Sequence, residues 1–185
     1  MTTQAEILDF WFAGDPSARR PVWFQKDDAF DADCRRFSEP LAAAKRSELD
    51  HWAGSAEGAL ALLILLDQLS RNLHRGSPEA FAADPKARAI ASGAIAQGFD
   101  RALTPVQRMF AYLPFEHSEE LADQDRSVAL FESIRAVLGD STLDYAARHR
   151  EVINRFGRFP HRNAVLGRAN TPAEEAYLAE PGAGF

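Results

Sequence analysis

Three clusters of charged and polar residues stand out in the sequence, and they hold the side-chain types that bind anions and transfer protons. One is RFGRFPHRNAVLGR (155–168), which has no acidic residue although the chain's formal net charge is -6. The planar fork of donors on an arginine fits a phosphate or a carboxylate. Two interpretations stay open: Arg158 and Arg162, with His161, bind an anionic ligand, or the arginines pair with the protein's own carboxylates.

A second cluster ends the most apolar segment of the chain and comprises Asp67, Gln68, Arg71, Asn72, His74 and Arg75. Residues four apart meet on one helix face, which pairs Asp67 with Arg71. Because charged groups in an apolar environment require partners, we predict that Arg71, Asn72 and Arg75 face a ligand. The alternative is that the arginines complement the dipole at the helix C-terminus and pair with carboxylates.

The remaining cluster is acidic and comprises Glu116, His117, Glu119, Glu120, Asp123, Asp125 and Arg126. A histidine beside a carboxylate can act as a general base, so His117 or His161 next to Glu120 or Asp123 is a candidate acid–base pair. The other explanation is that acidic residues in the first turn of a helix are favoured by its dipole. No full set of metal ligands is recognised, and we expect neither a metal nor a cofactor.

Helix signals follow one another along the whole chain, and no segment alternates apolar and polar residues as a strand does. We therefore predict an all-α protein of eight or more short helices packed as antiparallel pairs, in a single domain over residues 1–185. Helices are expected to begin at Thr3, Ser55, Asp84, Thr104, Ser118, Thr142 and Thr171, and to end near Gly14, Gly98, Pro114, Gly139 and Gly157.

Two of these helices have special features. The segment EGALALLILLDQLSRNL (57–73) is apolar all round, so we expect it to form the central, buried helix. The apolar stripe from Phe30 to Leu41 predicts a helix that Pro40 must kink or divide. The three tryptophans are expected in the core, and so is His149, which lies on an apolar face of the helix before Gly157.

Composition excludes several classes of protein. A single cysteine, Cys34, allows no intrachain disulfide and no cysteine-based zinc site. No apolar run approaches the roughly 20 residues that a membrane span needs, and the first residues do not have the pattern of a signal peptide. The acidic balance argues against general nucleic-acid binding. We expect a cytoplasmic protein without membrane or nucleic-acid partners.

Several long motifs in order resemble one known bacterial family. They are ILDFWF (7–12), LLILLDQLSRNLHRG (62–76), AFAADPKA (80–87), YLPFEHSEELADQDRSVALF (112–131) and the arginine-rich stretch 155–168. The sequence is similar over nearly its whole length to the family called Domain of Unknown Function 924. The resemblance implies an all-helical, tetratricopeptide-like fold and supplies no reaction. At Leu69-Ser70 this chain departs from the Phe-Pro expected there, which should soften a helix break.

Two functions from different classes remain. In the first, the three clusters form a pocket that binds a small ligand through a phosphate or carboxylate group. In the second, the protein is a helical interaction module that binds a peptide or a second copy of itself between helices, as the tetratricopeptide-like fold implies by analogy. A pocket requires residues far apart in the sequence, such as Arg71, His117 and Arg158, to come together.

Overall fold

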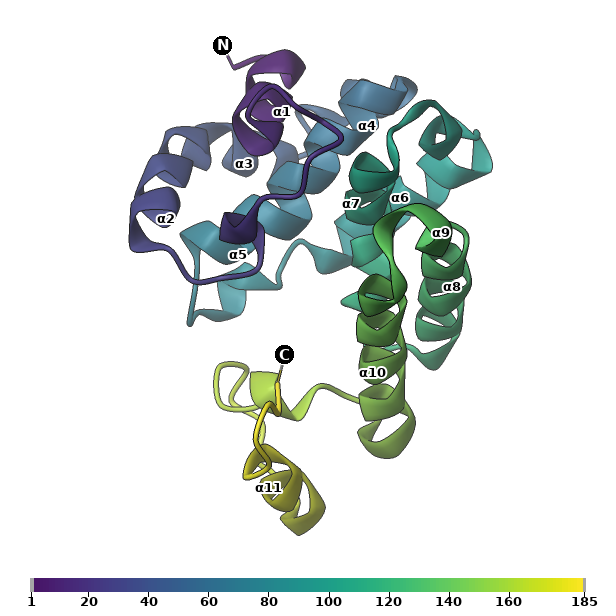
Figure 1. The fold of residues 1–185 in the computed structure, drawn as a ribbon. Coiled ribbons are helices and arrows are strands. Elements are labelled where there is room, and N and C mark those ends of the chain that lie inside the picture. Colours follow the sequence, from purple (N-terminus) through teal and green to yellow (C-terminus); the bar gives the residue numbers. More distant parts are fainter. Residues whose placement is uncertain (1, 185) are drawn as a thin grey trace. The chain divides into compact units, whose positions relative to one another are not determined.

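Residues 2–184, the part of the chain described by this computed structural model, contain helices, turns and loops and no strand (Figure 1). This confirms the all-α class, whereas the tetratricopeptide-like arrangement stays a prediction. The chain divides into two compact units. Unit 1 runs up to Arg75 and resumes over Glu79–Pro114, and unit 2 comprises Gly76–Pro78 and the chain from Phe115 onward. Each unit is described by itself, and the single domain stays a prediction.

Unit 1 is built from short helices connected by 3₁₀ turns. They are α1 (Gln4–Phe12), α2 (Asp28–Cys34), α3 (Ser38–Lys45), α4 (Ala56–Leu63), α5 (Ser70–Leu73), α6 (Asp84–Ala96) and α7 (Pro105–Glu116), the last of which extends two residues beyond the unit. Helix α4 packs against both α1 and α6. The chain thus places the α4 segment at the centre of unit 1.

The predicted helix starts are confirmed where a hydroxyl can cap. The Thr3 hydroxyl accepts from the Glu6 amide at 3.2 Å, and the Ser55 hydroxyl accepts from the Gly58 amide at 3.1 Å. Thr104 accepts from the Gln107 amide at 3.3 Å. The predicted helix start at Asp84 is confirmed, because α6 begins at this residue, but no side chain caps it and the Asp84 carboxylate binds an arginine instead.

Three predicted boundaries in the second half of the chain need correction. Helix α7 is predicted to end before Pro114, but it continues to Glu116, so the proline lies inside the helix. The helix expected from Ser118 to Gly139 is two helices, α8 (Leu121–Glu132) and α9 (Arg135–Leu138). The Ser133 hydroxyl between them donates to the Leu130 carbonyl at 2.6 Å, which competes with helix continuation. Helix α10 (Asp140–Phe156) begins two residues before Thr142.

The expected break at Pro40 lies elsewhere. A 3₁₀ turn at Arg35–Phe37 separates α2 from α3. Pro40 is therefore the third residue of α3, where a helix has no internal acceptor for the missing N–H. The apolar stripe is kept across the break, because Phe30, Cys34, Phe37 and Leu41 are all buried.

The central helix is buried as predicted, but it is not one regular α-helix. After α4 the chain forms a π-helical segment, Ile64–Leu69, and then continues as α5. Every residue from Ala59 to Leu66 is at most 2 % exposed. Burial of a leucine side chain contributes about 1.5–3 kcal/mol, so this segment supplies much of the stability of unit 1. π-Helical turns are frequent at functional sites, and this one holds Asp67 and Gln68.

An aromatic cluster joins α1 to α2 and α7 in unit 1. The Trp11 ring stacks on Trp23 with centroids 6.1 Å apart, and it meets the edge of Phe110 at 5.6 Å. Phe30 lies 5.7 Å from the same indole. Trp52 is buried in the 3₁₀ turn before α4. The predicted burial of the three tryptophans is confirmed.

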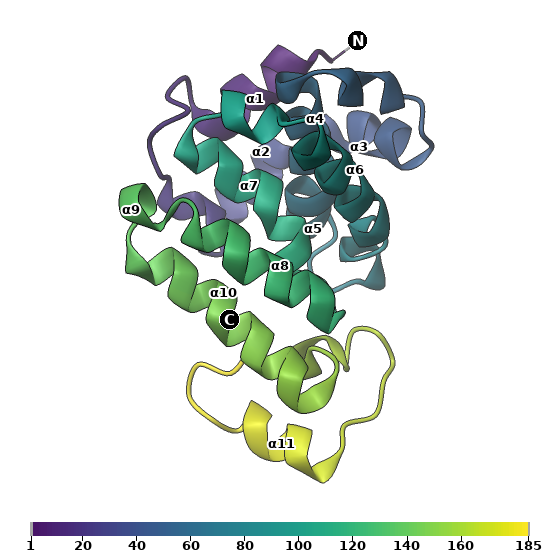
Figure 2. The ribbon, with the colours of Figure 1, turned by 90° about the vertical axis from the view of Figure 1, so that its right-hand side faces the viewer.

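Unit 2 is centred on a pair of antiparallel helices. Helices α8 and α10 lie side by side, with α9 connecting them at one end (Figures 1 and 2). Gly157 ends α10 with a φ of 67°, as the sequence predicts, and its amide donates to the Ile153 carbonyl at 2.7 Å. The last helix, α11 (Pro172–Leu178), begins with the predicted capping box of Thr171 and Glu174. No helix within residues 2–184 combines the length and apolarity needed to cross a membrane.

Candidate functional site

The polar end of the central helix in unit 1 is an ion-pair network. The Arg71 guanidinium donates to both carboxylate oxygens of Asp84 at 3.0 Å, and it lies 3.2 Å from the Asp67 carboxylate. Burial alone would lower the pKa of Arg71, but the charges of Asp67 and Asp84 raise it. Asp84, the first residue of α6, is therefore a partner of the predicted ligand-binding arginine.

The other two predicted ligand-binding residues of this helix end share Asp31 of α2. The Asn72 amide donates to its carboxylate at 2.7 Å, and Arg75 donates twice, at 3.0 and 3.1 Å. Burial opposes ionisation of Asp31, but the hydrogen bonds from Arg75 and Asn72 outweigh it and lower its pKa. The sequence offered no signal for Asp31, since it lies 41 residues before Asn72.

Two arginines of the stretch 155–168 also bind carboxylates of the protein. Arg158 donates to both oxygens of Glu174 at 2.6 and 2.7 Å. Arg168 donates to both oxygens of Glu119 at 2.7 and 2.9 Å, and Glu119 also accepts from the Phe159 amide. These contacts correspond to the internal pairing that the sequence left open. Glu119 joins the acidic cluster to the arginine-rich stretch.

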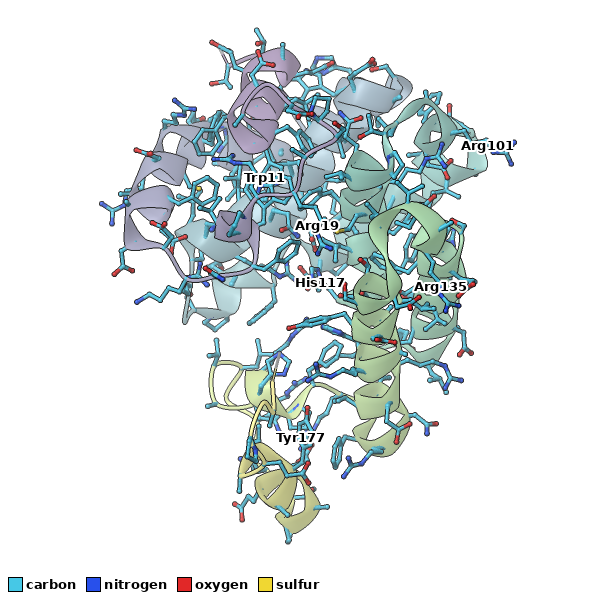
Figure 3. The ribbon with its side chains drawn as sticks, viewed as in Figure 1. Trp11, Arg19, Arg101, His117, Arg135 and Tyr177 are labelled. Carbon is cyan, nitrogen blue, oxygen red and sulfur yellow. The ribbon has the colours of Figure 1, made fainter. Side chains whose placement is uncertain are left out.

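Three imidazoles lie near one another in unit 2, and two of them contact the aromatic ring of Phe159. The rings of His117 and His149 are 6.5 Å apart, and the Phe159 ring lies 5.6 Å from His149 and 5.5 Å from His161. The Arg162 guanidinium stacks 4.4 Å from the Phe159 centroid and donates to the His117 carbonyl at 3.0 Å. We call these residues, together with the buried Glu116, the histidine cluster; Figure 3 marks His117.

Burial keeps two of these imidazoles neutral. It lowers the pKa of His149 to about 3, with the nearby His117 and Arg162 adding to the effect. Burial and the positive charge of Arg162 lower the pKa of His161 to about 4, although Glu119 acts in the opposite direction. At neutral pH both rings therefore carry one proton and one lone pair.

The tautomer of His149 follows from its contact with the backbone. Its Nδ1 lies 2.9 Å from the Tyr145 carbonyl oxygen, which can only accept, so Nδ1 holds the proton. Nε2 then carries the lone pair that can accept a proton or a hydrogen bond. The Glu116 carboxylate lies 3.6 Å from the same Nδ1 and orients a neutral imidazole, so this contact is not an ion pair.

The structure connects the predicted acid–base candidates to different neighbours. His117 and His161 belong to the histidine cluster. Asp123 accepts from the Ser118 hydroxyl at 2.7 Å near the start of α8, and Glu120 is exposed beside it. Their pairing with a histidine stays a prediction. His149, which the sequence placed in the core, is buried as expected, but it also belongs to the cluster.

No spacing signal in the sequence distinguishes His149 from an ordinary core residue, since it lies on an apolar face one turn beyond Tyr145. The fold brings the Phe159 ring against His149 only after the chain turns at Gly157. Within residues 2–184, no group of three or more His, Cys, Asp or Glu side chains is placed to hold a metal ion.

Comparison with known proteins agrees with this all-helical architecture. The chain belongs to a family described as bacterial protein of unknown function (DUF924), whose model matches residues 7–182. It is similar to the solved structure of a protein of unknown function from Agrobacterium tumefaciens, with 45% sequence identity and a TM-score of 0.85. That alignment covers 95% of this chain and 96% of the other. The comparison with curated proteins gives no match.

Proposed function

We propose that unit 2 binds a small molecule through a phosphate or carboxylate group at the histidine cluster. The observation that carries the proposal is the position of the buried Arg162 beside two imidazoles whose pKa burial lowers to about 3 and about 4. Strongly perturbed titratable groups occur preferentially at functional sites. Of the predicted ligand-binding residues, Arg162 is therefore the one on which this proposal depends.

The chemistry of the histidine cluster suits an anion. A guanidinium supplies several N–H donors, and a neutral imidazole supplies one donor and one acceptor. A positive charge in a buried environment attracts an anion more strongly than one in water does. His161 and His117 would contact the ligand.

Anion titration tests the proposal. Inorganic phosphate and malonate are added to the intact protein, and binding is followed by calorimetry and by thermal unfolding. A ligand at about a hundred times its dissociation constant should stabilise the protein by about 2.7 kcal/mol. His161→Gln is expected to weaken binding about tenfold, the loss of one charge-assisted hydrogen bond. His51→Gln, in an exposed position of unit 1, is the matched control and should bind like the wild type.

The outcome that contradicts the proposal is equally direct. If neither anion stabilises the wild-type protein at millimolar concentration, the histidine cluster does not bind this ligand class. Equal weakening in the His161→Gln and His51→Gln variants would place the anion elsewhere. Both variants keep a polar side chain of similar size, so a loss of folding is visible separately as a lower Tm without anion.

One observation favours the alternative of an interaction module. An open groove of about 1030 Å³ lies in unit 1 between the start of α1, α3 and the 3₁₀ turn before α4. Its lining includes the apolar Pro40, Ala43, Leu49 and Trp52, beside the charged Arg36 and Glu39. An extended peptide with apolar side chains fits such a lining. Absence of anion binding would favour this second function.

A further inference from the structure

The last residues of the chain form a strap across unit 2, which we define as residues 172–184. The strap begins with α11, and two groups hydrogen-bond to the Glu174 carboxylate in its first turn. The Glu174 carboxylate accepts from the Thr171 amide at 2.7 Å and from the Arg158 guanidinium at 2.6 and 2.7 Å. The hydrogen bonds from Arg158 and Thr171 lower the pKa of Glu174 to about 2. This end of the strap is therefore an ionic anchor.

The middle of the strap is held by apolar packing. Tyr177, marked in Figure 3, is buried against Val152, Ile153 and Phe159. Its ring centroid lies 5.2 Å from that of Phe156 at the end of α10. Leu178 and Ala183 pack against the same group. The strap thus covers Phe159, the ring that two imidazoles of the histidine cluster contact.

The far end of the strap touches the cluster itself. At Gly184 the backbone has a φ of 91°, which favours glycine. A Cβ added there would lie 2.9 Å from the Cβ of His161 and 3.4 Å from its Cγ. The Gly184 amide donates to the Tyr177 hydroxyl over a long 3.4 Å. Only a glycine combines this conformation with such a close approach to the imidazole.

We propose that the C-terminal strap is a cover over His161, hinged at its ionic anchor and released at Gly184, which controls access to the histidine cluster. The two ends differ in strength, because the start is tied to Arg158 by a bidentate ion pair, whereas the Gly184 amide makes one long hydrogen bond and its acceptor, Tyr177, belongs to the strap itself. The end therefore opens first. Control of ligand access by this opening rests on the proposed anion site. The covering of His161 by the strap does not depend on that site.

The electrostatic neighbours of His161 keep its imidazole neutral at neutral pH. Arg162, His117 and Arg168 act against its protonation, and only Glu119 acts in favour. The imidazole is therefore neutral under the strap. Opening would return water to the ring and raise the pKa of His161 toward its ordinary value, because burial is the largest cause of its depression.

Chemical modification of His161 tests the cover. Diethyl pyrocarbonate reacts with accessible neutral imidazoles, and peptide mapping reports each histidine separately. Gly184→Ala adds only the Cβ that meets His161, in a conformation that L-residues avoid, so the rate at His161 should rise about tenfold. The pKa of His161, followed by NMR, should rise in the same variant. The exposed His51 provides the reference rate in each sample.

Gly139→Ala is the matched control. Gly139 also has a positive φ, of 84°, but an added Cβ there meets no atom within 4 Å. This variant carries similar strain in unit 2 outside the strap, so the rate at His161 should stay at the wild-type value. Tyr177→Phe, which removes the acceptor of the Gly184 amide, should change the rate in the same direction as Gly184→Ala and by less.

An unchanged rate at His161 in a folded Gly184→Ala protein would overturn the cover, as would equal increases in the two glycine variants. If Gly184→Ala does not fold, as judged by circular dichroism, Tyr177→Phe decides by the same readout. These measurements contain no anion. A protein that binds no phosphate but shows the predicted rates would refute the proposed function and leave the strap intact.

Discussion

The two units solve the same physical problem differently, since each buries cationic or titratable side chains within an apolar framework. In unit 1, Arg71 lies between Asp67 and Asp84, and Arg75 binds Asp31. In unit 2, His149 and His161 avoid charge altogether, because burial holds their pKa far below 7. A buried ion either finds a counter-ion or becomes neutral.

The difference bears on function. A guanidinium held by two carboxylates has its donors directed at the protein, so the network at the end of the central helix supports the structure. A neutral imidazole has one N–H donor and one lone pair and carries no charge that needs a counter-ion. The unit 1 network is therefore expected to matter most for stability, and the histidine cluster for ligand binding and pH dependence.

The largest loss of stability is expected from a substitution that breaks the ion-pair network of unit 1. Asp84→Ala removes one of the two carboxylates that hold Arg71, whose side chain is only 21% exposed. Loss of one partner from a buried pair leaves a poorly compensated charge, and we expect the free energy of unfolding to fall by about 3 kcal/mol. Urea unfolding measures it. Glu48→Ala is the control, because it removes an exposed partner of Arg46 and should lower the free energy of unfolding much less than Asp84→Ala does. Equal losses of stability in the two variants would contradict the conclusion that the buried ion pair matters more than the exposed one.

The next effect concerns the neutral imidazoles of unit 2. Below pH 6.5 the unfolded chain protonates His149, whereas the folded protein does so only near pH 3, so its stabilising effect is present above pH 6.5 and declines as the pH falls. Between pH 7 and pH 5 the wild type should lose about 2 kcal/mol more than His149→Gln. Urea unfolding at several pH values checks this slope. Identical slopes in the wild type and in His149→Gln would contradict a neutral His149.

The smallest expected effect on stability is that of Arg75, which is more exposed than Arg71. The Arg75 side chain is 45% exposed in its pair with Asp31, so solvent screens the attraction. Arg75→Ala should lower the free energy of unfolding by less than about 1 kcal/mol in the same urea titration. Phosphate binding by this variant should match the wild type, since the proposed anion site lies in unit 2. A loss of phosphate binding would return Arg75 to the ligand-binding residues that the sequence predicts.

Local chemistry made several elements predictable. The Thr3, Ser55, Thr104 and Thr171 caps depend on a hydroxyl and an amide at most three residues apart. The all-apolar segment before Asp67 could only be buried. The start at Asp84 is confirmed although its carboxylate binds a distant arginine, whereas a predicted helix was divided where the chain has competing local hydrogen bonds, as at Ser133.

The sequence identified some residues of the candidate site but not all of them. His117, His161 and Arg162 were identified by residue type and by their place in polar stretches. His149 was not, because a histidine on an apolar helix face has the same pattern whether it is a core residue or part of a site. What distinguishes it is Phe159, which reaches His149 and His161 from the segment after Gly157.

By itself, the sequence determined the helical class, the buried central segment, the capping residues and the membership of the polar clusters, because these depend on periodicity and on contacts within one helical turn. The tertiary structure decided which charges are paired and which imidazoles are neutral. Those outcomes depend on burial and on neighbours such as Asp31 and Asn72, which are 41 residues apart in the chain. Long-range packing sets the local dielectric environment, and that environment separates an arginine that supports the fold from a histidine that can act on a ligand.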